Sequence, residues 1–185
     1  MQIFTTEIEG IKVLQPKIFN DDRGLFFESH NYKNFKAYGI DANFVQDNES
    51  HSKIGVLRGL HFQRNEHAQA KLIRVIKGEV LDVAVDLREN SPTFGKHFSI
   101  ILNAENKQQL YIPRGFAHGF VALSDHTITQ YKCDNYYNKE AEAGIIYNDA
   151  NLAIDWKLAD DLLRVNERDA NFPTLRQYLN KYEHA

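Results

Sequence analysis

The sequence predicts an all-β protein, a β-sandwich or small barrel, whose short helices lie at the periphery and mainly near the C-terminus. Two observations support this fold class. Short segments rich in β-branched and aromatic residues follow one another from about residue 10 to about residue 150. The helices that a doubly wound α/β sheet needs between its strands are missing. The chain has no internal repeat and no linker rich in Pro, Gly or Ser, so we expect a single domain over residues 1–185.

The N-terminal part is expected to form a hairpin followed by a helix. Two strand-like segments flank a polar turn, NDDRG, in the order 11–19, 20–24 and 24–30. The next segment, NYKNFKAYGI (31–40), predicts a short helix that ends at Gly39. One side of this helix would carry Tyr32, Phe35 and Tyr38.

The centre of the chain contains most of the expected strands. The segment KLIRVIKGEVLDVAVDL (71–87) predicts two strands, and Lys77-Gly78-Glu79 between them is typical of a hairpin turn. Further strands are expected at 96–103, 108–113, 116–123 and 127–137. After these strands, the tail from residue 159 to residue 185 has a helical pattern, interrupted at Asn171-Phe172-Pro173.

Composition excludes several classes of protein. The 25 acidic and 22 basic residues give a net charge of -3, which argues against a general nucleic-acid binder or a protein of anionic membranes. Cys133 is the single cysteine, so no internal disulfide can form, and a reducing cytoplasm fits. The first ten residues lack the features of a signal peptide, and no apolar run reaches the roughly 18 residues of a membrane span. We therefore expect a cytoplasmic protein.

The stretch GVLRGLHFQ (55–63) places charged and titratable groups inside a strand. Strict alternation would put Arg58 and His61 on opposite faces. Glycine within a strand often marks a bulge, and a bulge at Gly59 would shift the register by one residue. Arg58 and His61 would then point into one cavity. The alternative is an edge strand with a solvated Arg58 and a hydrogen-bonded His61.

Three later segments add polar side chains that could line the same cavity. Lys71 shares its strand parity with Ile73 and Val75, so it faces the core if they do, unless it precedes the strand and reaches water. His118 lies between alanine and glycine, where little bulk would block access to its ring. The tyrosines of the last strand are candidates for a proton donor or a stacking surface, although ordinary packing is the usual role of such residues: Tyr131, Tyr136 and Tyr137.

Two kinds of site compete for these residues. A metal site would need converging histidines and a carboxylate, but His61 and His67 are six residues apart and Gln63 stands where a His-x-His pair needs its second histidine. Lys71 would also repel a cation. The pattern favours metal-free acid–base chemistry, in which histidine is the base, lysine stabilises negative charge and tyrosine is the acid.

At this point the sequence resembles a known family. The motifs that carry the resemblance cover about residues 2 to 175 and occur in the order DDRGLFFE, FVQDNES, GVLRGLHFQ, AQAKLIRVIKGEVLDVAVDLRENSPTFG, IPRGFAHGF, YYNKEAEAGIIYND and IDW. They are very similar to those of the dTDP-4-dehydrorhamnose 3,5-epimerase family. The resemblance implies a cupin-type jelly roll, a homodimer and a reaction without metal or other cofactor. It implies conversion of dTDP-4-dehydro-6-deoxy-D-glucose to dTDP-4-dehydro-L-rhamnose, a step of dTDP-L-rhamnose synthesis.

The resemblance also implies roles for individual residues. His61 would be the base, Tyr131 the acid that protonates the opposite face, and Lys71 the cation beside the enolate oxygen. Asp169, in NERDANFP, would orient the base. Tyr137 would stack on the thymine ring. Positions that match substrate contacts of the family are Arg23, Glu28, Gln46, Asp47, Asn48, Arg58, Lys71, His118, Glu142 and Arg168.

Two of these positions carry further expectations. Arg23 and Glu28 lie on an N-terminal segment that the family exchanges between subunits, so each site would use both chains of a homodimer. Arg168 stands where relatives carry a lysine, which keeps the charge and changes the hydrogen-bond geometry.

Three alternatives to the double epimerase remain open. The first is an epimerase that inverts only C3 of a related dTDP-4-keto-6-deoxy sugar. Tyr131 favours inversion at C5 as well. The second is a catalytically silent cupin that binds sugar nucleotides, although such a module has no need of both an acid and a base. The third is a metal-dependent dioxygenase of the cupin type, which metal analysis of the purified protein would identify.

Overall fold

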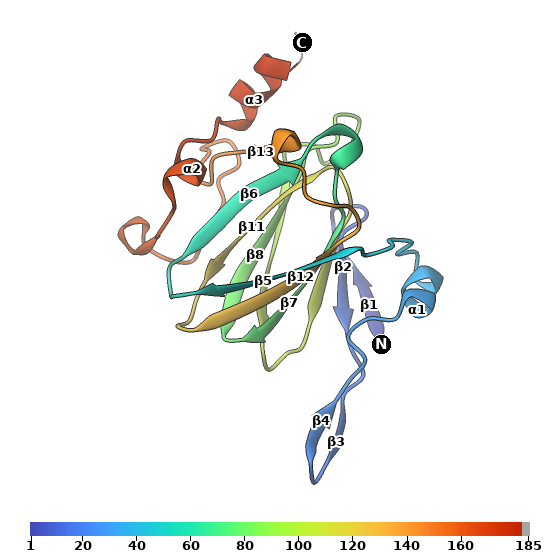
Figure 1. Ribbon diagram of the computed structural model, residues 1–185. Helices are drawn as coiled ribbons and strands as arrows, with labels where there is room; N and C mark the ends of the chain where they lie inside the picture. Colours follow the sequence, from blue (N-terminus) through green and yellow to red (C-terminus); the bar gives the residue numbers. More distant parts are fainter. Residues whose placement is uncertain (183–185) are drawn as a thin grey trace.

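The computed structural model describes residues 1–182 and consists of two antiparallel sheets packed face to face, which confirms the all-β prediction (Figure 1). The six-stranded sheet has the order β1 (Gln2–Thr5), β2 (Lys12–Gln15), β10 (Gln109–Ile112), β7 (Lys71–Lys77), β12 (Thr127–Cys133) and β5 (Gln46–Ser52). The five-stranded sheet has the order β13 (Glu142–Gly144), β6 (Leu57–Gln63), β11 (Phe116–Ala122), β8 (Glu79–Asp86) and β9 (His97–Asn103).

The core between the sheets is formed by inward-facing residues of both layers. It includes Ile73 and Val75 of β7, and Val80 and Ala84 of β8, all at most 4% exposed. The intervening residues of β8 face the other way and pack against the C-terminal tail in a second cluster. Strand β8 is therefore buried on both faces, which explains why its sequence is almost continuously apolar.

One expected pairing is wrong. Residues 71–77 and 79–86 do form strands, but β7 pairs with β10 and β12 whereas β8 pairs with β11 and β9. At Gly78 the chain passes from one sheet to the other instead of closing a hairpin. The sequence correctly predicts a turn at this position. It does not predict the partner of each strand, because that depends on long-range packing between the two sheets.

The turn at residues 20–24 and the helix after it form as expected, but residues 12–15 of the first strand-like segment join the six-stranded sheet as β2, and the hairpin is short. Strands β3 (Phe19–Asp21) and β4 (Gly24–Phe26) pair only with each other and project from the body of the molecule (Figure 1). Helix α1 (Tyr32–Ala37) begins at Asn31, whose side chain accepts a hydrogen bond from the Asn34 backbone N–H. Of the three aromatic residues of this helix, only Phe35 is buried in the core. Tyr32 and Tyr38 are each more than 40% exposed.

The C-terminal tail is helical in short pieces rather than throughout. These pieces are η3 (Asp160–Leu162), α2 (Glu167–Ala170) and α3 (Leu175–Tyr182), with the predicted break between α2 and α3. Two further single turns are η1 (Asn65–His67) and η2 (Lys139–Ala141). Residues 183–185 of the predicted helical tail lie outside the described residues. Within residues 1–182, no helix is long and apolar enough to cross a membrane.

Candidate active site

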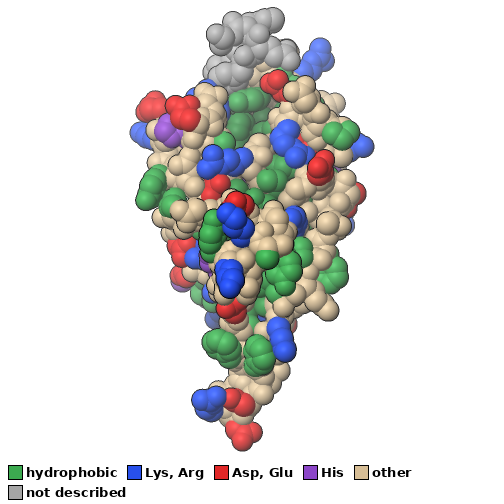
Figure 2. All heavy atoms as spheres, turned by 90° about the vertical axis from the view of Figure 1, so that its right-hand side faces the viewer, with side chains coloured by type: hydrophobic (Ala, Val, Ile, Leu, Met, Phe, Trp, Pro, Cys, Tyr) green, Lys and Arg blue, Asp and Glu red, His purple; other side chains and the backbone are tan. Residues whose placement is uncertain are grey.

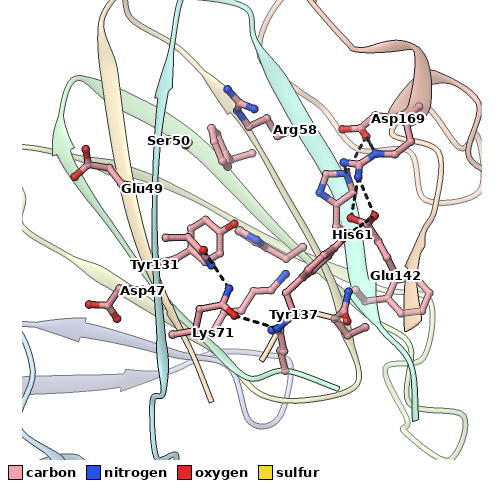
Figure 3. A pocket seen from close by; sticks show the side chains of 18 of the residues that line it. Asp47, Glu49, Ser50, Arg58, His61, Lys71, Tyr131, Tyr137, Glu142 and Asp169 are labelled. Atoms are coloured by element: carbon pink, nitrogen blue, oxygen red, sulfur yellow. Dashed lines mark hydrogen bonds and ion pairs between the residues drawn. The ribbon is translucent and has the colours of Figure 1, made fainter. Parts of the chain in front are cut away.

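A cavity of about 600 Å³ lies between the two sheets and collects most of the predicted site residues (Figure 3). Its walls come from β5, β6, β7, β11, β12, β13 and the segment around α2. The predicted residues that line it are Gln46, Asp47, Asn48, Arg58, His61, Lys71, His118, Tyr131, Tyr137, Glu142, Arg168 and Asp169. Residues that are far apart in the sequence thus line one cavity.

A bulge in β6 brings Arg58 and His61 to the same cavity, as predicted. His61 pairs with His118 of β11, and Arg58 pairs with Phe120, so β6 has one more residue than β11 between these pairs. The extra residue lies beside Gly59, where an added Cβ would be 2.5 Å from the Cα of Gly119. Only glycine allows the two backbones to approach this closely, and the resulting shift cancels the strict alternation.

His61 is paired with Asp169. The His61 Nε2 atom lies 2.9 Å from Oδ1 of Asp169, whose side chain is completely buried, whereas 24% of the His61 side chain is exposed. Because a carboxylate accepts hydrogen bonds, this contact places the proton on Nε2 and leaves the lone pair on Nδ1. The geometry is that of a base held in one tautomer by a carboxylate.

Asp169 is itself held by several donors. Its second oxygen accepts a hydrogen bond of 3.1 Å from the Gly59 backbone N–H. Burial raises the pKa of Asp169, but hydrogen bonds from His61, Gly59 and Arg168 outweigh burial and lower it below the ordinary value. The position of Asp169 on α2 is set by the helix cap, because Asn166 Oδ1 accepts from the Asp169 N–H at 2.7 Å. The carboxylate therefore stays ionised beside the imidazole.

Arg168 connects the His61–Asp169 pair to the rim of the cavity. Its Nη1 lies 2.8 and 2.9 Å from the two oxygens of Glu142, and its Nε donates to Asp169 Oδ1 at 3.1 Å. Its Nη2 is 3.2 Å from His61 Nε2. When His61 Nε2 carries a proton, both atoms are donors, so this approach is a packing contact and not a hydrogen bond. Tyr137 completes the network by donating its hydroxyl to Glu142 Oε2 at 3.1 Å.

Lys71 and Tyr131 face His61 from the opposite sheet (Figure 3). Lys71 is 9% exposed and shares the inward face with Ile73 and Val75, so the expectation of a core-facing lysine is confirmed. Burial lowers the pKa of the Lys71 ammonium, although Cys133, Asp82 and Glu142 act to raise it. Burial raises the pKa of the Tyr131 hydroxyl. The cavity thus contains a lysine whose ammonium group loses its proton more readily than usual and a tyrosine whose hydroxyl keeps its proton more firmly than usual.

A second histidine–carboxylate pair lies at the floor of the cavity, and its carboxylate was missed by the sequence analysis. His118 Nε2 lies 2.9 and 3.1 Å from the two oxygens of Asp82, which is completely buried on β8. Burial lowers the pKa of His118 even though Asp82 acts to raise it, so the ring is neutral near pH 7. The sequence signal was present, because Asp82 has the inward parity of Val80 and Ala84 within an otherwise apolar strand.

Other lining residues were also missed, and most are polar. Gln63 accepts a hydrogen bond from the Asn138 N–H, and Ser50 shares a 2.6 Å hydrogen bond with Thr129. The unpredicted lining residues are Glu49, Ser50, Phe62, Gln63, Gln69, Phe120 and Asn166. Nothing in the local sequence distinguishes them from other residues of strands and loops, because their position in the cavity depends on how the two sheets and the tail meet.

Arg23 and Glu28 do not line the cavity of their own chain. Arg23 lies on the projecting hairpin with 90% of its side chain exposed, where it pairs with Asp21. Glu28 follows the hairpin and accepts hydrogen bonds from Asn31 and Asn34. A contribution of either residue to a substrate site would therefore require a second subunit. Tyr136 is exposed and also lies outside the cavity lining.

Among residues 1–182, no group of three or more His, Cys, Asp or Glu side chains is arranged to hold a metal ion. The two histidines of the cavity each face a single carboxylate, and Lys71 lies among them. The donor set that surrounds the cavity is suited to proton transfer and to binding an anionic molecule.

Fold and site together define a β-sandwich protein with a polar cavity between its sheets, in which a carboxylate-held histidine on one sheet faces a tyrosine and a lysine on the other, a combination typical of acid–base enzymes. Comparison with known proteins gives the particular family. The sequence profile of the dTDP-4-dehydrorhamnose 3,5-epimerases matches residues 5–177. The dTDP-4-dehydrorhamnose 3,5-epimerase of Escherichia coli strain K12 is 50% identical over 180 residues, covering 97% of each chain.

Solved structures agree. The crystal structure of dTDP-4-dehydrorhamnose 3,5-epimerase from Elizabethkingia anophelis NUHP1 is 50% identical, with a TM-score of 0.93 over 96% of this chain and 97% of that one. The 3,5-epimerase of Legionella pneumophila Philadelphia 1, solved in complex with dTDP-4-keto-L-rhamnose, is 48% identical, with a TM-score of 0.91 over 95% and 93% of the two chains. The chain belongs to the dTDP-4-dehydrorhamnose 3,5-epimerase family. The predicted family, enzyme class and cupin-type β-sandwich are thereby confirmed.

Proposed function

We propose that this protein inverts C3 and C5 of dTDP-4-dehydro-6-deoxy-D-glucose to give dTDP-4-dehydro-L-rhamnose, and that the cavity around His61 is the catalytic site. The observation that carries the proposal is the placement of base and acid on opposed sheets. His61 belongs to β6 of one sheet and Tyr131 to β12 of the other, and both line one cavity. A sugar ring between them would meet a base on one face and an acid on the other.

The chemistry of the substrate explains why these groups are needed. The C4 ketone acidifies the hydrogens on C3 and C5, because loss of either proton gives an enolate whose charge rests on the C4 oxygen. His61 Nδ1 takes the proton, and Asp169 stabilises the imidazolium that forms. Lys71 lies in the cavity as the cation for the enolate oxygen. Tyr131 then donates a proton to the opposite face of the carbon, which inverts the centre.

The proton balance requires no cofactor and no metal ion. In each inversion His61 gains one proton and Tyr131 loses one, while the substrate neither gains nor loses electrons. Before the second inversion, His61 must release its proton and Tyr131 must regain one. The partial exposure of His61 gives that exchange a route to water.

The nucleotide end of the substrate fits the rim of the cavity. Tyr137 is half exposed there and presents a ring for stacking on a base. Arg58 and Arg168, with Lys71 further inside, supply local positive charge for a diphosphate within a protein of net charge -3. We assign substrate contacts on the same grounds to Gln46, Asp47, Asn48, His118 and Glu142.

The protein is proposed to act as a homodimer in which the N-terminal hairpin completes the neighbouring site. The hairpin projects from the body, and Figure 2 shows hydrophobic side chains gathered along it with charged groups at its tip. Phe19, Leu25 and Phe26 are each more than half exposed in the single chain. Such apolar surface on a projecting segment favours burial against a second copy, and this would carry Arg23 and Glu28 to the partner's cavity.

Mixed dimers test this arrangement. Arg23→Ala and His61→Ala homodimers are each expected to lose activity. A mixed dimer pairs the intact hairpin of one subunit with the intact His61 of the other, so an equilibrated mixture should recover about a quarter of wild-type activity. A mixture no more active than its components would contradict the exchanged hairpin.

We also propose that the protein is cytoplasmic. Its single cysteine, Cys133, is buried, which fits a reducing compartment.

The proposed reaction is tested by product identification. The protein is incubated with dTDP-4-dehydro-6-deoxy-D-glucose, an NADPH-dependent 4-ketoreductase and NADPH, and the nucleotide sugars are separated and analysed by NMR. We expect dTDP-L-rhamnose. A product inverted at C3 alone would identify the single-centre epimerase, and unchanged substrate with retained dTDP binding would identify a binding protein.

A further inference from the structure

The space beside His61 is shaped by a glycine on the neighbouring strand. Gly144 of β13 is the cross-strand partner of His61. Its backbone does not have the positive φ that favours glycine, so conformation does not explain the residue. A Cβ added at this position would lie 2.5 Å from Cδ2 and 2.6 Å from Cζ of Phe172. Gly144 therefore leaves room for an aromatic ring from the tail.

Phe172 uses this room to contact the imidazole. The two rings meet edge to face, with centroids 5.6 Å apart and an interplanar angle of 76°. The guanidinium carbon of Arg168 lies 5.9 Å from the centroid of the same phenyl ring. The segment is tied to the sheet directly after Phe172, because the Ile146 N–H donates to the Pro173 carbonyl at 2.9 Å. The position of the Phe172 ring is thus restrained by Arg168 before it in the chain and by the backbone hydrogen bond of Pro173 after it.

One short segment consequently supplies two restraints on His61. Asp169 fixes the Nε2 end through a hydrogen bond, and Phe172, three residues later, packs against the ring. A hydrogen bond to one nitrogen restrains that end of the imidazole but leaves the ring free to tilt about it. Packing against a second surface restricts the tilt and so fixes the direction in which Nδ1 points.

We propose that Phe172 is a positioning residue for His61 and that Gly144 is the position that makes this contact possible. The role rests on the proposed function of His61 as the base. The expected effect is on the chemical step rather than on binding, because Phe172 does not line the substrate cavity. A misdirected base loses rate steeply, and a displacement of about 1 Å can cost on the order of 100-fold.

The first test is a set of variants measured by deuterium exchange at C3 and C5 of the substrate. Phe172→Ala should lower both exchange rates about 10- to 100-fold and leave the Kd for dTDP within about two-fold. Phe172→Leu, which refills much of the space, should restore most of the rate. Phe44→Leu is the matched control, because Phe44 makes a similar edge-to-face contact with another histidine, His30, at a centroid distance of 5.4 Å, and does not line the cavity. It should exchange at the wild-type rate.

A double-mutant cycle tests the part played by Gly144. Gly144→Ala should displace the phenyl ring and lower exchange as Phe172→Ala does. Once the ring is absent, the added methyl group has nothing to displace, so the double variant should be no slower than Phe172→Ala alone. Fully additive losses would show that Gly144 acts independently of Phe172 and would overturn the proposed pairing.

The second readout needs no substrate. In the wild-type protein labelled with ¹³C,¹⁵N-histidine, the relaxation of the His61 ring signals should be that of one fixed orientation. In Phe172→Ala it should show exchange between tilted orientations, while Asp169 still holds the tautomer. Wild-type exchange rates in Phe172→Ala, or unchanged His61 signals, would overturn the proposal. Absence of exchange in the wild-type protein would instead refute the proposed function, and the NMR comparison would still decide the positioning role.

Discussion

His61 Nε2 and Asp169 Oδ1 meet at 2.9 Å although they come from a central strand and from the C-terminal tail. The backbone explains the meeting. The tail is tied to β6 by hydrogen bonds from Arg164 N–H to the Gly55 carbonyl at 2.8 Å and from Leu57 N–H to the Arg164 carbonyl at 3.1 Å. Further along, the Gly59 N–H donates to Asp169 itself. The strand that carries the base thus also fixes the carboxylate that orients it.

Asp169→Asn should reduce exchange at C3 and C5 by about 100-fold or more, because the amide no longer enforces one imidazole tautomer or stabilises the imidazolium. Binding of dTDP should be nearly unchanged, as measured by calorimetry. The matched control is Asp149→Asn. Asp149 is buried and accepts a hydrogen bond from the Leu175 N–H at 2.7 Å, so it anchors the same tail without touching His61. Equal losses of turnover in both variants would show that Asp169 only anchors the tail and does not orient His61.

Tyr131→Phe removes the proposed acid and keeps the ring. Inversion should fall about 100-fold or more, because it needs the acid on the opposite face, and exchange with solvent should fall less, because it needs only the base. Positional deuterium analysis by NMR measures both in one sample. Tyr136→Phe, at an exposed site outside the cavity lining, should behave as the wild type. Inversion at the wild-type rate in Tyr131→Phe, or exchange reduced as much as inversion, would contradict the acid assignment.

The alkaline limb of activity should report Lys71. Burial lowers the pKa of its ammonium, so the charge is lost at a lower pH than in an ordinary lysine, whereas burial raises the pKa of Tyr131 and keeps its proton in place. The rate should therefore fall as pH rises through the lowered pKa of Lys71. In Lys71→Arg the guanidinium stays charged, so the limb should move to higher pH although the overall rate is reduced. If the alkaline fall in rate stays at the same pH in Lys71→Arg, it reports the titration of another group.

Stability should depend on Asp86, far from the chemistry. Burial raises its pKa, but hydrogen bonds from Arg88, Ser91 and Thr93 outweigh burial and lower the pKa well below the ordinary value. A lowered folded-state pKa gives stabilisation that is present above the unfolded pKa of about 3.9 and is lost as pH falls. Asp86→Asn should reduce the free energy of unfolding by about 3 kcal/mol near pH 7, as measured by urea denaturation.

The same comparison at low pH supplies the check. The difference between Asp86→Asn and the wild type should shrink below about pH 4, where the wild-type carboxylate begins to lose its advantage. Asp21→Asn, on the exposed hairpin, should change stability little at any pH. A difference that is independent of pH would show that shape, rather than charge, is what Asp86 contributes.

Much of the fold follows from local sequence. Alternation marks β12, and short runs of apolar residues mark β7 and β9. Burial on both faces marks β8 and β11. Strand partners do not follow in the same way. The turn at Gly78 is correctly predicted, but β7 and β8 enter different sheets because their partners are chosen by the packing of the two layers. Local patterns define elements, and long-range contacts define their neighbours.

The site shows the same division. The bulge at Gly59 and the inward face of Lys71 could be predicted from parity and glycine placement alone. The role of Asp169 came only from the family resemblance, since nothing local links the tail to β6. Asp82 and Phe172 were missed, although an acidic residue at an inward position of a buried strand is a usable signal for the first. Phe172 acquires its contact with His61 only once the tail is docked.

The most direct test of the account is deuterium incorporation from D₂O. The protein is incubated with dTDP-4-dehydro-6-deoxy-D-glucose in D₂O, the product is trapped by the reductase and NADPH, and mass spectrometry and NMR locate the label. Because His61 removes each proton and Tyr131 returns one that comes from solvent, a rhamnose product should carry one deuteron at C3 and one at C5. His61→Ala should introduce neither. A product labelled at C3 alone, or label at both carbons in His61→Ala, would contradict the account.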